Sequence, residues 1–296
     1  MSAPDLKLTI ITPTYNAREH IRQCMASVRM QSFRDYEHLI VDGHSTDQTI
    51  ELVKDYSRGD ERIRFISEKD NGIYDAMNKG INLAKSKWLY FLGADDSLKD
   101  PDTLKNIVGY LSREYADIVY GNVFFQNLQK VYDHEFSAEK LLKRNICHQA
   151  IFYHRSVFMK LGFYDLHYKT QADYAFNLKC WLSGKVSQLY VPELIANFAD
   201  GGKSSESLDP EFVKDFPSIS VRALLDGNKS ILIKIHLLAS IYRKIILRKE
   251  YLNSELLKNL FVSRQFVTRC CAFIWMIVSS PFYFLEKETQ HNHGLY

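Results

Sequence analysis

The stretch Trp88–Asp96 reads WLYFLGADD, an apolar run that ends in two adjacent carboxylates. A short apolar run of this kind predicts a buried strand, which would place Asp95 and Asp96 at the edge of a sheet, where α/β proteins bind ligands. Carboxylates in such a position suit a hard divalent cation, and Mg²⁺ or Mn²⁺ usually shares its oxygen ligands with the phosphates of a substrate. The alternative is that the pair only caps a following helix, because Asp is a favoured capping residue and Pro101 follows soon after.

Three segments upstream repeat the order of strand, polar loop and helix. Short apolar runs predict strands over Leu8–Thr12, His38–Val41 and Ile63–Ile66. After each run, apolar residues recur at helical spacing, starting near Ile21, Thr49 and Ile73. Such alternation indicates an α/β fold with a mainly parallel sheet covered by helices, whose binding crevice lies at the carboxyl ends of the strands. Four acids follow these strands and would converge on that crevice: Asp42, Asp70, Asp95 and Asp96.

Several short motifs follow one another in a specific order. In the first hundred residues they are Thr12–Asn16 (TPTYN), Val41–Asp47 (VDGHSTD), Asn71–Gly72 with Asn78–Gly80, and Leu92–Asp96 (LGADD). Further along they are Cys147–Gln149, Leu161–Asp165, Ala172–Tyr174 and Gly201–Ser204. In order and spacing these motifs resemble those of the family-2 glycosyltransferases with a GT-A fold, of the bacterial surface-polysaccharide type, over about residues 6–205. The resemblance implies a mainly parallel, mixed sheet flanked by helices.

The resemblance also implies which residues hold a nucleotide-sugar donor. The matched positions are Thr12, Pro13, Tyr15, Asp42, Asn78, Asp95, His148 and Lys203. The first three would line the nucleotide pocket, Asp42 would hydrogen-bond the base, and Asp95 would lie near the ribose and diphosphate. His148 would bind a donor phosphate or an acceptor sugar, although a histidine beside apolar Ile151 is equally a satisfied core residue. Lys203 lies either in a plain surface turn or in a lid whose amides meet the diphosphate.

Two further carboxylates carry the chemistry that the resemblance implies. Asp96, with Asp95, would ligate Mn²⁺ or Mg²⁺ and so lower the charge that builds up on the leaving diphosphate. Asp173 matches the general base of the family, which takes the proton of the acceptor hydroxyl as that hydroxyl attacks the anomeric carbon. One displacement inverts the anomeric configuration and needs no covalent nucleophile. The alternative for Asp173 is an acid that only stabilises the first turn of a helix.

Two positions depart from the usual family pattern. The second motif commonly has two consecutive acids, but Gly43 and then His44 follow Asp42 here. The fourth motif often carries an acid where this chain has Gly93, so the predicted metal site depends on the pair that follows it. We therefore expect UDP as the nucleotide, and the support for UDP is the general resemblance and not these two motifs.

The composition is that of a folded enzyme. The chain has 296 residues, with 46% hydrophobic and 25% charged residues, which is ordinary for a globular protein. The five cysteines show no metal-type spacing, and their odd number argues against a full disulfide framework. Because the N-terminal residues enter the first predicted strand directly, leaving no room for a signal peptide, we expect a cytoplasmic protein.

The C-terminal third differs from the rest in charge and hydrophobicity. We expect a catalytic domain over residues 1–215, with a nucleotide-sugar-binding half (1–100) and an acceptor-side half (101–215), and a basic, apolar, helical region over 216–296. From Lys229 onward there are ten Lys and Arg residues against four Glu residues, whereas the whole chain carries only +3. The uncharged run Cys270–Leu285 is too short to span a bilayer, so it predicts an interfacial helix on a membrane surface. The alternative is that the region packs onto the catalytic domain or a second copy of the chain.

Three hypotheses for function follow from these observations. The first is an inverting, metal-dependent glycosyltransferase that acts on a lipid-linked (polyprenyl-diphosphate) or oligosaccharide acceptor at the cytoplasmic face of a membrane. The second is a sugar-1-phosphate nucleotidyltransferase, which would need a Gly-rich loop with Arg and Lys after the first strand, and Thr12–Asn16 supplies neither. The third is a non-catalytic scaffold recruited to membranes. A nucleic-acid-binding protein is not indicated, because the basic residues match no nucleic-acid module.

Overall fold

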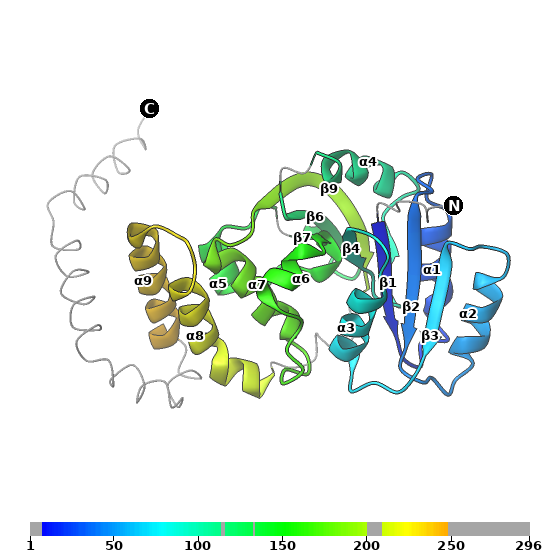
Figure 1. The fold of residues 1–296 in the computed structure, drawn as a ribbon, viewed down its shortest axis with the longest axis horizontal. Coiled ribbons are helices and arrows are strands. Elements are labelled where there is room, and N and C mark those ends of the chain that lie inside the picture. The colour runs from blue at the N-terminus through cyan, green and yellow to red at the C-terminus, as the bar shows by residue number, and fades with distance from the viewer. Residues whose placement is uncertain (1–7, 114–115, 133, 200–208, 248–296) are drawn as a thin grey trace, which may run out of the picture.

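The computed structural model describes residues 8–113, 116–132, 134–199 and 209–247. These residues form one mixed sheet of nine strands with helices on both faces (Figure 1). The strands lie in the order β3, β2, β1, β4, β8, β6, β9 and β5, and β7 pairs with β6 outside this path.

The first hundred residues form the parallel half of the sheet. The elements are β1 (Leu8–Thr14), α1 (Ile21–Arg29), β2 (Tyr36–Asp42), α2 (Thr49–Ser57), β3 (Ile63–Ser67), α3 (Ile73–Leu83) and β4 (Trp88–Phe91). β1 pairs in parallel with both β2 and β4, and β2 pairs in parallel with β3. The predicted strands, helices and parallel pairing are confirmed, and the carboxyl ends of these four strands share one edge.

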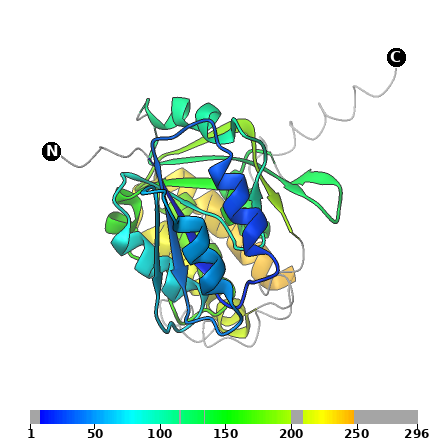
Figure 2. The same ribbon diagram turned by 90° about the vertical axis from the view of Figure 1, so that its right-hand side faces the viewer.

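Neighbouring residues of β1 face opposite layers of helices, because side chains alternate along a strand. Ile11 packs in a cluster with α3, whereas Ile10 packs in a cluster with Cys24 and Val28 of α1. Figure 2 shows α1 and α2 in front of the parallel strands. α3 approaches β1 so closely that a Cβ atom at Gly80 would collide with the Ile11 side chain. The sheet is thus covered on both faces, as a parallel sheet requires.

The second half of the chain adds antiparallel strands and a buried central helix. Its elements are β5 (Ser97–Leu98), α4 (Thr103–Leu111), β6 (Ile118–Phe125), β7 (Lys130–Tyr132), α5 (Ala138–Lys143), the 3₁₀ helix η1 (His148–Ala150), β8 (Ile151–His154), α6 (Ser156–Leu161), α7 (Ala172–Ser183) and β9 (Gln188–Phe198). β8 pairs antiparallel with β4 and β6, and β9 pairs in parallel with β6. α7 is buried nearly all round and packs against α5, α6 and α8.

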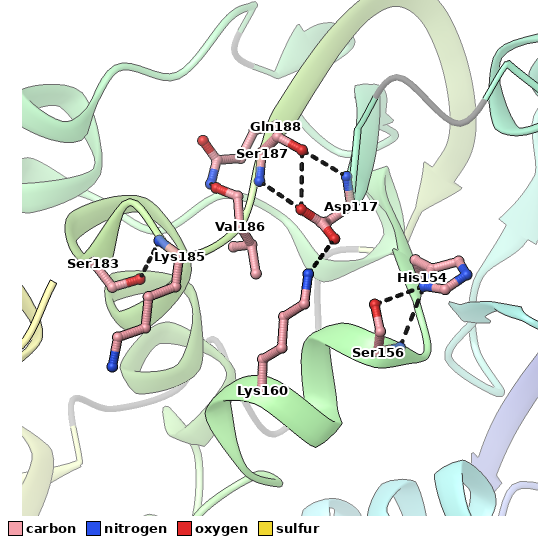
Figure 3. A network of polar contacts seen from close by, with 9 residues as sticks. All are labelled: Asp117, His154, Ser156, Lys160, Ser183, Lys185, Val186, Ser187 and Gln188. Carbon is pink, nitrogen blue, oxygen red and sulfur yellow. Dashed lines mark hydrogen bonds and ion pairs between the residues drawn. The ribbon is translucent and has the colours of Figure 1, made fainter. Parts of the chain in front are cut away.

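A network of polar contacts lies at the end of the sheet where β4 and β6 begin, opposite to the carboxyl ends of β1 and β4 (Figure 3). Asp117, directly before β6, accepts hydrogen bonds from Lys160 Nζ of α6 at 2.8 Å and from the Ser187 amide at 2.9 Å. His154 Nδ1 lies 2.7 Å from Ser156 Oγ of α6. These contacts tie α6 and the start of β9 to the sheet, away from Asp95 and Asp96.

The C-terminal helices α8 (Pro210–Leu225) and α9 (Ile231–Leu247) pack onto the catalytic domain. The expected boundary at residue 215 falls inside α8, and Phe212 and Phe216 on either side of it are buried in the same cluster as α7. The shift in composition therefore does not coincide with a break between elements. Among the residues described, no helix is both long and apolar enough to cross a membrane. The predicted interfacial segment Cys270–Leu285 lies outside the described residues.

The packing of α9 predicts contrasting effects for two leucines on that helix. Leu237 is 1% exposed, whereas Leu232 is 67% exposed. Replacing Leu237 by Ala is expected to lower the free energy of unfolding by about 2–5 kcal/mol, because it leaves a cavity against the core. The Leu232→Ala control is expected to change it by less than about 0.5 kcal/mol. Urea unfolding measures both values, and equal values for the two variants would show that α9 does not belong to the folded core.

Candidate active site

The loops after β2 and β3 are joined through Asp42. Its carboxylate accepts hydrogen bonds from the Ser45 amide at 3.0 Å and from Ser67 Oγ at 2.7 Å. Asp42 is fully buried, so in this structure it holds the loops that form the crevice. Asp70 lies close to the same turn, since a Cβ atom at Gly43 would stand 2.5 Å from Asp70 Oδ2. The missing second acid of this motif is thus a position where a side chain would displace Asp70.

The residues predicted to line the nucleotide pocket differ in exposure. Tyr15 is 58% exposed, at the loop after β1. Thr12 and Pro13 are buried, and Thr12 Oγ1 lies 3.0 Å from His38 Nε2. The Thr12 hydroxyl also lies 3.9 Å from Cys24 Sγ of α1, so it packs between the sheet and that helix, and its place in the nucleotide pocket stays a prediction. Tyr15 is exposed enough to contact a nucleotide directly.

The contact of Thr12 with buried His38 predicts a pH-dependent stability. Burial lowers the pKa of His38 from 6.5 to about 3, so below pH 6.5 the unfolded chain binds a proton that the folded protein does not. Stability contributed by neutral His38 is therefore present above pH 6.5 and is lost as the pH falls toward 3. From about pH 7.5 to about pH 4.5 the loss amounts to about 2–3 kcal/mol. Urea unfolding should show that His38→Gln removes this part of the slope, whereas His20→Gln, at an exposed histidine, keeps it.

Asp95 and Asp96 fold back over Gly93. A Cβ atom at that glycine would stand 2.5 Å from Asp96 Oδ2 and 2.9 Å from Asp95 Oδ1. Asp96 is 2% exposed, and its carboxylate accepts hydrogen bonds from the Ala199 amide at 2.9 Å and from Gln149 Nε2. The glycine in place of the usual acid leaves the space into which both carboxylates turn.

The donor set of this pair fits a divalent cation. Both carboxylates turn to the same side of Gly93, so one oxygen of each lies near the other, and carboxylate oxygens are ligands that suit Mg²⁺ and Mn²⁺. Within the described ranges, no group of three or more His, Cys, Asp and Glu residues could hold a metal. A cation at Asp95 and Asp96 would therefore need ligands from the donor diphosphate and from water.

Asp173 stands in the first turn of α7 and is 7% exposed. Tyr74 Oη donates to its Oδ1 at 2.7 Å, and Asn145 Nδ2 donates to its Oδ2 at 2.8 Å. Burial and the neighbouring Asp173 raise the pKa of Tyr74 well above its ordinary value, so this hydroxyl stays protonated and remains a donor. Each oxygen keeps a further lone pair for an acceptor hydroxyl.

His148 lies within electrostatic reach of both groups of carboxylates. Burial lowers its pKa below the ordinary value, while the charges of Asp173 and Asp95 act in the opposite direction. The imidazole is therefore held neutral near both acids, where it can accept or donate one hydrogen bond to a substrate.

Asn78 and Lys203 are the two remaining residues that are predicted to bind the donor. Asn78 Nδ2 donates to the Tyr164 carbonyl at 2.9 Å, and Asn78 Oδ1 accepts from the Tyr164 amide at 3.0 Å. Both ends of this carboxamide are thus used to fix the loop before α7, and Asn78 takes a structural role here. Lys203 lies outside the described residues.

Three side chains at the site were not predicted from the sequence: Tyr74, Asn145 and Gln149. Gln149 belongs to the motif that contains His148, but nothing in the motif indicates a contact with Asp96. Tyr74 lies in the first turn of α3, just after the N-cap Gly72 with its positive φ of 117°. These contacts join positions 28 to 99 residues apart, so only the fold reveals them.

Comparisons with known proteins agree with the fold. The model of "Glycosyl transferase family 2" matches residues 9–165. A PGL/p-HBAD biosynthesis glycosyltransferase of Mycobacterium bovis is 39% identical over 221 residues, which cover 73% of this chain and 86% of that protein. An uncharacterized glycosyltransferase of Mycobacterium tuberculosis is 33% identical over 188 residues, covering 61% of this chain and 70% of that protein.

Solved structures share the fold at low sequence identity. S. aureus TarS 1-349 in complex with UDP-GlcNAc has a TM-score of 0.68 and 18% identity, covering 84% of this chain and 74% of that chain. The mannosyltransferase PcManGT of Pyrobaculum calidifontis, in complex with GDP-Man and Mn²⁺, has a TM-score of 0.58 and 16% identity, covering 83% and 76%. The predicted GT-A fold is thereby confirmed. With the family model spanning more than half of its length, this chain is a glycosyltransferase that belongs to glycosyl transferase family 2.

Proposed function

We propose that this enzyme transfers a sugar from a nucleotide-diphosphate donor to an acceptor hydroxyl with inversion of the anomeric configuration. The observation that supports the proposal is the pairing of two carboxylate sites. Asp95 and Asp96 turn to the same side of Gly93 after β4, and Asp173 stands at the start of α7, with His148 within electrostatic reach of Asp95 and Asp173. One site suits a donor diphosphate and the other suits an acceptor.

In the proposed reaction Asp173 accepts the proton of the acceptor hydroxyl. The hydroxyl oxygen attacks the anomeric carbon from the side opposite the nucleotide, and the bond from that carbon to the diphosphate oxygen breaks. The electron pair of this bond leaves with the nucleoside diphosphate. A divalent cation bound at Asp95 and Asp96 would neutralise the charge that develops on this leaving group. Tyr74 and Asn145 hold the Asp173 carboxylate throughout.

We propose a UDP-hexose or UDP-N-acetylhexosamine as the donor, with Mn²⁺ or Mg²⁺ as the cation. Support for UDP comes from TarS, a neighbour in fold whose structure contains UDP-GlcNAc; support for a cation comes from the mannosyltransferase with GDP-Man and Mn²⁺. The name of the Mycobacterium bovis relative supports a role in assembling a glycoconjugate. The proposed acceptor is a lipid-linked or oligosaccharide chain.

Thermal unfolding tests the donor proposal. The protein is unfolded with UDP, GDP, CDP or dTDP, each with Mn²⁺ and with EDTA. A ligand at about 100 times its dissociation constant adds about 2.7 kcal/mol to the native state, which shifts the midpoint by a few degrees. We expect such a shift with UDP and Mn²⁺ and its loss in EDTA. The absence of a shift with all four diphosphates would contradict a donor-dependent enzyme.

We also propose that the C-terminal region holds the enzyme at the cytoplasmic face of a membrane. Residues from Lys229 onward are net positive, and Ile231, Leu232 and Ile233 at the start of α9 are exposed. Apolar and basic residues together favour a surface with anionic lipids. We expect the protein to sediment with phosphatidylglycerol vesicles and not with phosphatidylcholine vesicles. Equal sedimentation with both, or with neither, would contradict this proposal.

A further inference from the structure

The short segment Asn145–Gln149 contacts both carboxylate sites through its first and last side chains. Asn145 Nδ2 donates to Asp173 at 2.8 Å, and Gln149 Nε2 donates to Asp96. We infer that Asn145 and Gln149 are positioning residues that fix the base Asp173 and the cation-side carboxylate Asp96 relative to each other. The inference rests on the roles proposed above for these two carboxylates.

The orientation of the Gln149 carboxamide is determined by a contact on its far side. Cys147 Sγ donates to Gln149 Oε1 at 2.8 Å. Because the oxygen of the carboxamide accepts this hydrogen bond, the nitrogen faces Asp96. Gln149 and Asp96 are both 2% exposed, so a rotated carboxamide would leave a buried donor without its partner, which is unfavourable.

The orientation of Asn145 is determined by a directed chain of hydrogen bonds. Tyr153 Oη donates to Asn177 Oδ1 at 2.8 Å, and Asn177 Nδ2 donates to Asn145 Oδ1 at 3.0 Å. Because Asn145 Oδ1 accepts from Asn177, Asn145 Nδ2 faces Asp173. Tyr153 and Asn177 are fully buried, so every donor in the chain has one acceptor and the direction cannot reverse without an unsatisfied group.

The consequence is a fixed separation between the two sites. Asn145 lies shortly before η1 and Gln149 lies within it, and η1 continues into β8 of the sheet. The acceptor oxygen held at Asp173 must reach the anomeric carbon of a donor whose diphosphate lies at Asp95 and Asp96, and a misplacement of about 1 Å can lower the rate about 100-fold. A segment that holds both carboxylates therefore sets the geometry of transfer.

Double-mutant cycles test the two positioning residues, Asn145 and Gln149, without any substrate. Gln149→Met and Asn145→Leu remove the donor groups with little change of volume, and each is combined with Asp96→Asn and with Asp173→Asn. We expect each amide to couple with its own carboxylate by about tenfold in the unfolding equilibrium constant, and the crossed pairs to be additive within about twofold. Equal coupling in all four pairs, or in none, would overturn the inference.

Binding and turnover then separate the two roles. We expect Gln149→Met to weaken Mn²⁺-dependent stabilisation by UDP by about tenfold or more in affinity. Asn145→Leu is expected to keep that affinity within about twofold while lowering kcat for UDP release from UDP-N-acetylglucosamine, or from the nucleotide sugar that the UDP screen selects, by about tenfold or more. The controls are Gln188→Met and Asn122→Leu, whose carboxamides bond the Cys180 and Val186 carbonyls and the Tyr190 hydroxyl, respectively.

The outcomes distinguish this inference from the proposed function. If the unsubstituted protein shows no Mn²⁺-dependent shift with UDP, the proposed function fails while the stability cycles still report on the two positioning residues. If UDP binding and turnover occur but the two variants change both properties alike, or behave like the controls, the positioning inference fails and the proposed function stands.

Discussion

Replacing Asp173 by Asn is expected to lower the rate of sugar transfer by about 10²- to 10⁴-fold, the usual contribution of a general base, while UDP affinity stays within about twofold. The substitution keeps the volume of the side chain but removes its ability to take a proton. Both neighbours of this carboxylate, Tyr74 and Asn145, donate to it, so an amide nitrogen at position 173 displaces one of these hydrogen bonds, most readily that of Tyr74, whose hydroxyl can donate to the Thr170 carbonyl instead. Turnover is measured as UDP release, and affinity as the UDP-dependent shift of the unfolding midpoint.

A matched control separates this effect from a general loss of stability. Asp117 also accepts hydrogen bonds from two neighbours, Lys160 and Ser187, but at the opposite edge of the sheet (Figure 3). Asp117→Asn should lower the free energy of unfolding by a similar amount, about 1–3 kcal/mol, and leave turnover unchanged at a temperature where both variants are folded. If the two variants lose turnover alike, Asp173 acts through stability and not as the base.

The parallel half of the fold could be predicted from the sequence because local pattern determines it. Each apolar run of four to five residues was followed by a helix with apolar residues at positions such as Ile21, Met25 and Val28, and both appear as expected in β1–β4 and α1–α3. Asp95 and Asp96 then follow β4 through a short turn, which keeps them near the carboxyl end of the strand. These predictions need no information about distant contacts.

The environment of the same residues could not be predicted, because it depends on the second half of the sheet. Thr12 lies in a strand buried on both faces, and an unbroken apolar pattern does not show which side chains reach the crevice. Asp96 meets Gln149 and Ala199 only because β8 inserts antiparallel beside β4 and β9 returns along β6. Such pairings between distant segments leave no periodic trace in the sequence.

The C-terminal region differs in another way from what its composition predicts. Its basic and apolar composition indicated a membrane surface, but Phe216, Leu224 and Leu237 are buried against the catalytic domain. Helical periodicity shows that a helix has an apolar face and does not show what covers that face. In α8 and α9 the catalytic domain covers much of it, and among the side chains of these helices whose burial is described, the exposed large apolar ones are Leu225, the stretch at the start of α9 and Tyr242.

Replacing Asp96 by Asn is expected to remove the Mn²⁺-dependent part of UDP binding. The cation would lose one charged ligand from a pair that offers only two carboxylates, and the new amide nitrogen would face either Gln149 Nε2 or the Ala199 amide, both of which are donors. We expect the midpoint shift with UDP and Mn²⁺ to fall from a few degrees to that seen in EDTA, which corresponds to a loss of about 2–3 kcal/mol at a ligand concentration near 100 times the dissociation constant. Asp173→Asn is the reciprocal control, because it should keep the full shift.

Equal loss of UDP affinity in the two variants would overturn the division between a cation-side carboxylate after β4 and a base at the start of α7. A residue that acts only on the acceptor has no reason to weaken the binding of a nucleotide.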